Sequence, residues 1–145
     1  MSADLSFFDT NVLLYMHSAA DPEKQFRAQQ LFTACLENSR IILSTQVIQE
    51  FHAAGSRKLA LPRQSLRVLT LALLELPLVQ VGPAHIKTAL STQEEYGISF
   101  WDALILAAAQ SSGARILYTE DLNDGQQYGN LRVENPFRDI KARRS

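Results

Sequence analysis

Several residue types that would define a class of protein are scarce in this sequence. The single cysteine, Cys35, cannot form an internal disulfide. It lies in AQQLFTACL, where apolar residues recur with helical spacing, so we expect Cys35 to be a small buried hydrophobe. The three histidines, His17, His52 and His85, are widely separated and form no zinc-binding spacing. The sequence therefore indicates neither a disulfide scaffold nor a zinc site.

Long apolar runs are also missing. No stretch approaches the roughly 20 apolar residues that a helix needs to cross a bilayer. The first residues, MSADLSFFD, do not show the basic segment followed by an apolar one that is typical of a signal peptide. We therefore expect a cytoplasmic protein that does not enter a membrane.

Neither sign of charge is in excess, since 14 Lys and Arg residues nearly balance 15 Asp and Glu residues and leave a formal net charge of −1. A protein with this balance does not attract nucleic acid over its whole surface. Any contact with RNA or DNA must use a local basic patch. A glycine-rich phosphate loop of the GxxxxGK type is absent as well.

What the sequence does contain is a regular alternation of short strand patterns and longer helical patterns. The candidate strands are residues 5–8, 40–43, 77–81, 115–118 and 131–133. The candidate helices lie near residues 11–18, 22–37, 45–60, 62–75, 83–95 and 100–112. Prolines 22, 62 and 83 stand where three of these helices should begin. The alternation predicts an α/β fold with a mainly parallel sheet.

The length of 145 residues and the 46% hydrophobic content suit one soluble globular domain. We see no repeat or linker, so we expect a single domain over residues 1–145 with its core at about 5–134. Residues 135–145 are rich in basic side chains, and we expect a solvated tail there.

Acidic residues follow two of the predicted strands. Asp9 interrupts the apolar run FFDTNVLLY at the carboxyl end of the first strand, where ligands bind in open parallel sheets. The segment TEDLNDG follows strand 115–118 in the same way and contains Glu120, Asp121 and Asp124. Both features also have purely structural explanations, because Asp is a common helix cap and TEDLNDG has an ordinary turn composition.

Two further acids lie on predicted helices. Asp102 falls in SFWDALILAAA, a helix that is apolar on nearly every side and is therefore buried. Its position three residues after Ser99 is also that of a capping box. Glu50 flanks the apolar face that Val47 and Phe51 mark, although a solvated glutamate fits the same position.

These acids occupy positions that can meet at one end of the sheet, and the set is Asp9, Glu50, Asp102 and Asp121. Because like charges repel and raise one another's pKa, a divalent cation would stabilise such a group. Ligands that are all oxygen favour Mg²⁺ or Mn²⁺ over Zn²⁺. The sequence therefore predicts a magnesium or manganese site.

The same motifs resemble the PIN domain, and within it the small VapC-type toxin ribonucleases of bacterial toxin–antitoxin pairs. The resemblance covers about residues 5–134 and depends on FFDTNVLLY, VIQEF, SFWDALILAAA and YTEDLNDG. It implies a PIN-like three-layer α/β/α sandwich with a central, mainly parallel sheet of four or five strands.

The resemblance also implies an endoribonuclease that depends on Mg²⁺ or Mn²⁺ and uses the four acids as its acidic set. Asn11 and Thr119 look like the polar residues that support the site in this family. Glu120, Asp121 and Asp124 compete for the last acidic position; Asp121 is the first choice, and Asp124 remains a candidate metal ligand. Bound cations would activate water and neutralise the phosphoryl oxygens.

Four basic residues are candidates for contacting RNA phosphates, namely Arg57, Lys58, Arg63 and Arg67. Ordinary solvated helix charge is the alternative explanation for them. The alternative function is a non-catalytic PIN-like module that binds protein or RNA. A haloacid-dehalogenase-type phosphatase is disfavoured because Asn11 stands where its second acid is required.

The helices predicted at 45–60 and 62–75 contain more leucine than one buried stripe requires, namely Leu59, Leu61, Leu66, Leu69, Leu71, Leu73 and Leu74. This excess predicts a second apolar surface. The resemblance implies the same, because toxins of this type are homodimers that also bind an antitoxin protein. A monomer with all of these leucines in one core is the alternative.

Overall fold

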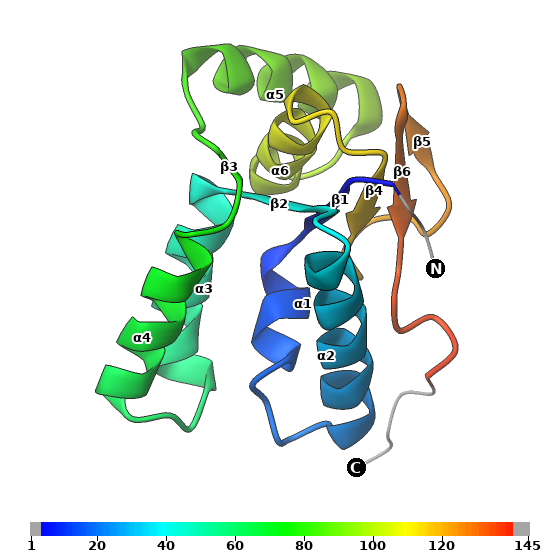
Figure 1. The fold of residues 1–145 in the computed structure, drawn as a ribbon. Coiled ribbons are helices and arrows are strands. Elements are labelled where there is room, and N and C mark those ends of the chain that lie inside the picture. The colour runs from blue at the N-terminus through cyan, green and yellow to red at the C-terminus, as the bar shows by residue number, and fades with distance from the viewer. Residues whose placement is uncertain (1–3, 141–145) are drawn as a thin grey trace.

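The computed structural model describes residues 4–140 as three layers, with a sheet between two layers of helices (Figure 1). The six helices are α1 (Thr10–Tyr15), α2 (Pro22–Glu37), α3 (Thr45–Lys58), α4 (Arg63–Leu73), α5 (Pro83–Tyr96) and α6 (Phe100–Ser111). In Figure 1, α5 and α6 lie above the strands, whereas α1 and α2 lie below them and α3 and α4 form a hairpin beside α1. The predicted α/β sandwich is confirmed.

The strands of the sheet follow the order β3-β2-β1-β4-β6-β5. Their bounds are β1 (Ser6–Phe8), β2 (Ile41–Ser44), β3 (Leu78–Val79), β4 (Ile116–Tyr118), β5 (Gln127–Tyr128) and β6 (Leu131–Glu134). Every pairing is parallel except that of β5 with β6. The sheet thus has six strands where the sequence predicted four or five, because β5 is only two residues long and has no alternating apolar pattern.

The register of the central strands places the segments that follow β1 and β4 side by side. Phe8 at the end of β1 pairs with Tyr118 at the end of β4. The backbone N–H of Asp9 donates a hydrogen bond of 3.0 Å to the Tyr118 carbonyl. Because both strands run in the same direction, the residues that follow them emerge at the same edge of the sheet.

The core explains why these strands hold their places. Ser6, Phe7 and Phe8 are fully buried, and the Phe8 ring lies 5.5 Å from that of Phe32 and 5.2 Å from that of Tyr118. Residues 103–109 of α6 are all buried, as expected for a helix that is apolar all round. Cys35 is a buried free thiol, which confirms the prediction from its helical spacing.

Part of the predicted basic tail packs against the fold. Phe137 is only 3% exposed, and its ring lies 5.0 Å from the Tyr15 ring. The Arg27 guanidinium donates to the Pro136 carbonyl at 2.8 Å. The expectation of a solvated tail is therefore wrong for residues 135–140, because one aromatic side chain anchors them. Residues 141–145 lie outside the described part of the chain.

Within residues 4–140, none of the helices combines the length and the apolar composition that crossing a bilayer requires. The longest of them, α2, alternates charged and amide side chains with a narrow buried stripe formed by Ala28, Phe32 and Cys35.

Candidate active site

A cavity of about 320 Å³ opens at the carboxyl edge of the sheet, where α1, α3, α6 and the loop after β4 meet. Its lining contains all four predicted acids, together with apolar side chains and two cations. The lining residues are Asp9, Thr10, Asn11, Leu14, Glu50, Ala53, Ala54, Arg57, Lys58, Trp101, Asp102, Ile105 and Asp121.

Asp9 forms the buried floor of this cavity. Its side chain is the N-cap of α1 and accepts a 2.7 Å hydrogen bond from the Thr10 N–H. The other carboxylate oxygen accepts a 2.7 Å bond from the Thr119 hydroxyl. Burial raises the pKa of Asp9 to about 7, and the nearby charges of Asp121 and Glu50 act in the same direction. The same carboxylate therefore caps α1 and lines the cavity.

Glu50 reaches the cavity from the middle of α3. Its Oε1 accepts a 2.8 Å hydrogen bond from the hydroxyl of Thr10, the residue next to Asp9. The Gln46 amide, one helical turn earlier, donates a longer bond of 3.4 Å to Oε2. The side chain is partly buried, so Glu50 is fixed in the site and is not a freely solvated helix glutamate.

Asp102 enters from the first turn of α6. The Ser99 hydroxyl accepts a 3.1 Å hydrogen bond from the Asp102 N–H and caps the helix, as the sequence predicts. This cap engages the backbone N–H of Asp102, and it does not involve the Asp102 carboxylate. The carboxylate lines the cavity in a partly buried position.

Asp121 approaches from the loop after β4 and is held by both predicted supporting residues. The Asn11 amide donates to its carboxylate, and the buried Thr119 hydroxyl accepts a 3.1 Å bond from the Asp121 N–H. The pKa of Asp121 is raised, first by burial and then by the charges of Asp102 and Glu120. The carboxylates of the site thus act on one another electrostatically.

The two competing acids of the same loop have other partners. Glu120 forms an ion pair of 2.9 Å with Lys24 of α2. Asp124 accepts a 2.7 Å hydrogen bond from the Asn135 N–H and pairs with Arg138 at 3.2 Å. Neither residue lines the cavity with the other acids. The structure therefore brings Asp121 to the cavity and places the candidate ligand Asp124 outside it, against Asn135 and Arg138.

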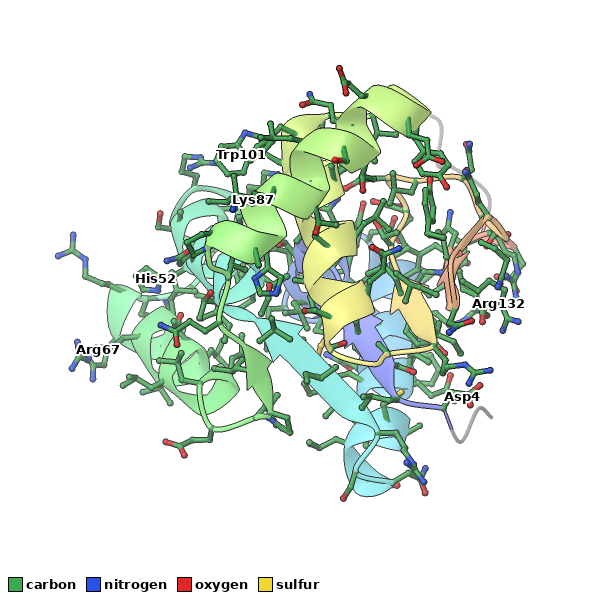
Figure 2. All side chains as sticks on the ribbon, turned by 90° about the horizontal axis from the view of Figure 1, so that it is seen from above. Asp4, His52, Arg67, Lys87, Trp101 and Arg132 are labelled. Carbon is green, nitrogen blue, oxygen red and sulfur yellow. The ribbon has the colours of Figure 1, made fainter. Side chains whose placement is uncertain are left out.

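The four candidate RNA-binding residues separate into two pairs. Arg57 and Lys58, at the end of α3, line the cavity. Arg63 and Arg67 belong to α4 and do not, and Figure 2 shows Arg67 pointing outward from that helix. The positive charge of Lys58 acts to lower the pKa of Asp121, although burial and the neighbouring carboxylates raise it by more. Only the first pair adjoins the carboxylates.

Sequence reasoning missed three contributors, Thr10, Gln46 and Trp101. Thr10 binds Glu50, and Gln46 connects Glu50 to the backbone carbonyl of Trp101 with bonds of 3.4 and 3.3 Å. The helical spacing of Gln46 and Glu50 on α3 was a usable signal, because residues four apart share a face. No sequence pattern indicated that Trp101 is exposed, because the helix that contains it is apolar on nearly every side.

The donor chemistry suits a hard divalent cation, since the cavity offers carboxylate oxygens and, among residues 4–140, no histidine or cysteine. In this arrangement, however, no three acidic, histidine or cysteine side chains of the described residues are grouped closely enough to hold one ion. Glu50 and Asp121 are instead hydrogen-bonded to Thr10 and Asn11. The histidines have other partners, such as the 2.8 Å contact of His52 with Thr70.

The fold and the acidic cavity define an α/β protein with a carboxylate site at the carboxyl edge of a parallel sheet. Comparison with known families identifies it further: the sequence model of the PIN domain matches residues 6–124. The chain belongs to the PIN domain family. No curated protein sequence matches it.

Solved structures with the same fold include a toxin and complexes that contain one. A toxin–antitoxin complex from Klebsiella pneumoniae has a TM-score of 0.69 and 21% identity, over 90% of this chain and 97% of that one. VapC20 of Mycobacterium tuberculosis, a sarcin–ricin loop cleaving toxin, gives 0.66 and 18%, over 80% and 89%. VapBC2 of Rickettsia felis, bound to promoter DNA, gives 0.64 and 19%, over 90% and 97%. At these identities the likeness concerns the fold.

Proposed function

We propose that this protein is a cytoplasmic endoribonuclease that depends on Mg²⁺ or Mn²⁺ and acts as the toxin of a toxin–antitoxin pair. The observation that carries the proposal is the convergence of Asp9, Glu50, Asp102 and Asp121, from four separate segments, on one cavity. Membership of the PIN domain family and structural neighbours that include a toxin cleaving the sarcin–ricin loop support it.

A divalent cation bound in this cavity would supply an activated water and would neutralise the phosphoryl oxygens of the substrate. Asp9, Asp102 and Asp121 are the residues that we propose would hold it, although in the arrangement described above their side chains are not grouped closely enough for one ion. Glu50 would hold a second cation or orient the water. Thr119 and Asn11 fix the directions of Asp9 and Asp121 through their hydrogen bonds.

The two basic residues of the cavity would bind the RNA backbone. Arg57 and Lys58 provide positive charge at the end of α3, where a phosphate next to the scissile one could lie. Within residues 4–140 neither side chain forms an ion pair with an acid. Neither cation is therefore held in a direct ion pair, although Lys58 is near enough to Asp121 to affect the pKa of that carboxyl, and both could contact a phosphate.

The test is cleavage of an end-labelled RNA by the purified protein. We expect cleavage in Mg²⁺ or Mn²⁺, loss of cleavage in EDTA, and recovery when the cation is restored in excess. Lys58→Ala should raise KM by weakening phosphate binding, whereas Arg67→Ala, on the outer side of α4, is the matched control and should have little effect. A protein that binds RNA without cutting it under any of these conditions would instead be a binding module.

An antitoxin and a second copy of the chain are the proposed protein partners. Several of the structural neighbours are toxin–antitoxin complexes. An apolar groove of about 210 Å³ lies between α1, α2, α3 and α4, with Leu36 exposed at its edge, and suits an amphipathic segment of such a partner. The exposed apolar face of α4, formed by Val68, Leu71 and Leu74, suits a second copy.

A further inference from the structure

The cavity contains one large aromatic side chain that the proposed chemistry does not use. Trp101, the only tryptophan of the sequence, is 62% exposed although it precedes the buried stretch of α6. Of the large hydrophobic side chains in the described residues, only that of Phe26 is more exposed. An exposed indole at the wall of a polar cavity is typical of a binding surface.

The backbone that carries this indole is held by its neighbours, and one aromatic ring packs against the indole. The Phe100 ring lies 5.3 Å away in an edge-to-face arrangement, and Phe100 itself packs against the buried cluster of Ala89, Ala103 and Leu104. The buried Gln46 amide donates to the Trp101 carbonyl at 3.3 Å and connects the start of α6 to α3. Trp101 is therefore a supported platform and not part of a loose segment.

The platform shares the cavity with charges of both signs. Asp102 is the next residue in the chain, and Arg57 and Lys58 face the same cavity from α3. Figure 2 shows Trp101 at the outside of the molecule, at the start of α6. A ligand at this point would meet an aromatic surface, two cations and the carboxylates together.

Unpaired nucleic acid matches this combination. Its phosphates bind cationic side chains, and its bases stack on aromatic rings, whereas in a duplex both faces of each base are already covered. Resting on the function proposed above, we infer that the Trp101 indole stacks with one nucleobase of an unpaired RNA segment, beside the phosphate that lies at the carboxylates. Stacking on Trp101 should favour unpaired strands over duplexes but should distinguish little between one base and another, because every base has a face that can stack.

The single tryptophan makes this inference directly measurable. Tryptophan fluorescence is followed while an unstructured RNA of about 12 nucleotides, or a duplex of the same length, is added in Ca²⁺, with gels to confirm that the RNA stays intact. We expect the unpaired RNA to quench the fluorescence and to bind at least about fivefold more tightly than the duplex. Equal quenching by both would overturn the inference.

Substitutions separate stacking from other roles of the side chain. Trp101→Ala should weaken binding of the unpaired RNA, measured by anisotropy of a labelled strand, by about tenfold. Trp101→Phe should restore most of the affinity, and Phe26→Ala, which removes an equally exposed ring on α2, is the control that should leave it unchanged. Unchanged melting temperatures exclude unfolding. If Trp101→Ala binds RNA with wild-type affinity, the inference is overturned. If its mass in light scattering is also half that of the wild type, the indole belongs to a protein contact instead.

Cleavage of the same RNA in Mg²⁺ distinguishes this inference from the function on which it rests. If the wild type quenches with RNA but never cuts it, the nuclease proposal fails and the platform stands. If the wild type cuts the RNA and Trp101→Ala has unchanged KM and kcat, the platform fails and the nuclease proposal stands.

Discussion

At the scale of single residues, the buried carboxylate of Asp9 is the most unusual feature of the site. It is 6% exposed and receives two hydrogen bonds, yet burial still raises its pKa to about 7. The folded protein therefore keeps a proton on Asp9 at pH values where the unfolded chain, with a pKa near the ordinary 3.8, has released it. Stability from this group is greatest below about pH 4 and is lost as the pH rises towards 7.

Without divalent cations, Asp9→Asn should consequently become more stable relative to the wild type as the pH increases. Over the interval from about pH 4 to 7 the difference in free energy of unfolding should change by about 3 kcal/mol in favour of the variant. Urea denaturation at a series of pH values in EDTA measures it. A difference that is constant with pH would mean that Asp9 titrates alike in the folded and unfolded states.

The loop after β4 provides a second test at this scale, because three acids are close in sequence and only one lines the cavity. Asp121→Asn should lower the rate of RNA cleavage by roughly 100-fold or more, since it removes a charge that faces the substrate. Glu120→Gln and Asp124→Asn are matched controls that should retain most of the activity. If Asp124→Asn were the inactive variant, the placement of the metal ligands would have to change.

The sequence was sufficient to predict that Asp9 and Asp102 lie near one another, because each stands at a strand or helix end that the topology places at one edge of the sheet. It could not distinguish Glu120, Asp121 and Asp124. That choice depends on which side chain Lys24 and Arg138 pair with, and these partners come from distant parts of the chain. The role of Thr10 could not be predicted either, since its hydrogen bond to Glu50 joins residues that are 40 apart in the sequence.

At the scale of secondary structure, α3 and α6 deliver most of the site. On α3, Glu50 and Arg57 line the cavity with helical spacing, and Gln46, one turn before Glu50, donates to its carboxylate. The start of α6 fixes both Asp102 and Trp101, and its geometry depends on the Ser99 cap. Sequence patterns predicted all six helices, since each is amphipathic or buried throughout, although α1 ends at Tyr15 and is shorter than the predicted 11–18. They missed β5, whose two residues pair only through the hairpin with β6.

Removal of the α6 cap should therefore have a local cost. Ser99→Ala leaves the Asp102 N–H without its 3.1 Å partner and should reduce the free energy of unfolding by about 1 kcal/mol. Ser99→Thr keeps a hydroxyl at the same place and should recover most of this loss, and Ser99→Gly should cost only a few tenths of a kcal/mol. Equilibrium denaturation followed by circular dichroism measures all three. An unchanged midpoint for Ser99→Ala would show that water caps the helix equally well.

At the scale of the whole molecule, the predicted leucine surface is smaller than its sequence suggested. Leu59 and Leu66 are buried, and Leu61, Leu69 and Leu73 pack against the same core. Leu71 and Leu74 remain, at 49% and 46% exposure. Propensity and composition identified the excess of apolar residues, but only the packing of α4 on α3 separates the core side chains from the free ones.

If the α4 face joins two copies, the double variant Leu71→Glu/Leu74→Glu should be a folded monomer. Light scattering at micromolar concentration should give twice the 16.2 kDa of one chain for the wild type and a single mass for the variant. Both should have the same helical circular dichroism, because the substituted side chains lie outside the core. A wild type of 16.2 kDa would refute the dimer, and a variant that stays dimeric would place the interface elsewhere.

The central claim is that the carboxylates gathered at the edge of the sheet perform cation-dependent RNA cleavage. The most direct measurement is the cleavage rate of an end-labelled RNA in saturating Mg²⁺ for the wild type and for Asp102→Asn, whose Ser99 cap and buried helix are unaffected. We predict a fall of roughly 100-fold or more with an unchanged melting temperature in EDTA. Cleavage by Asp102→Asn at the wild-type rate would contradict the account.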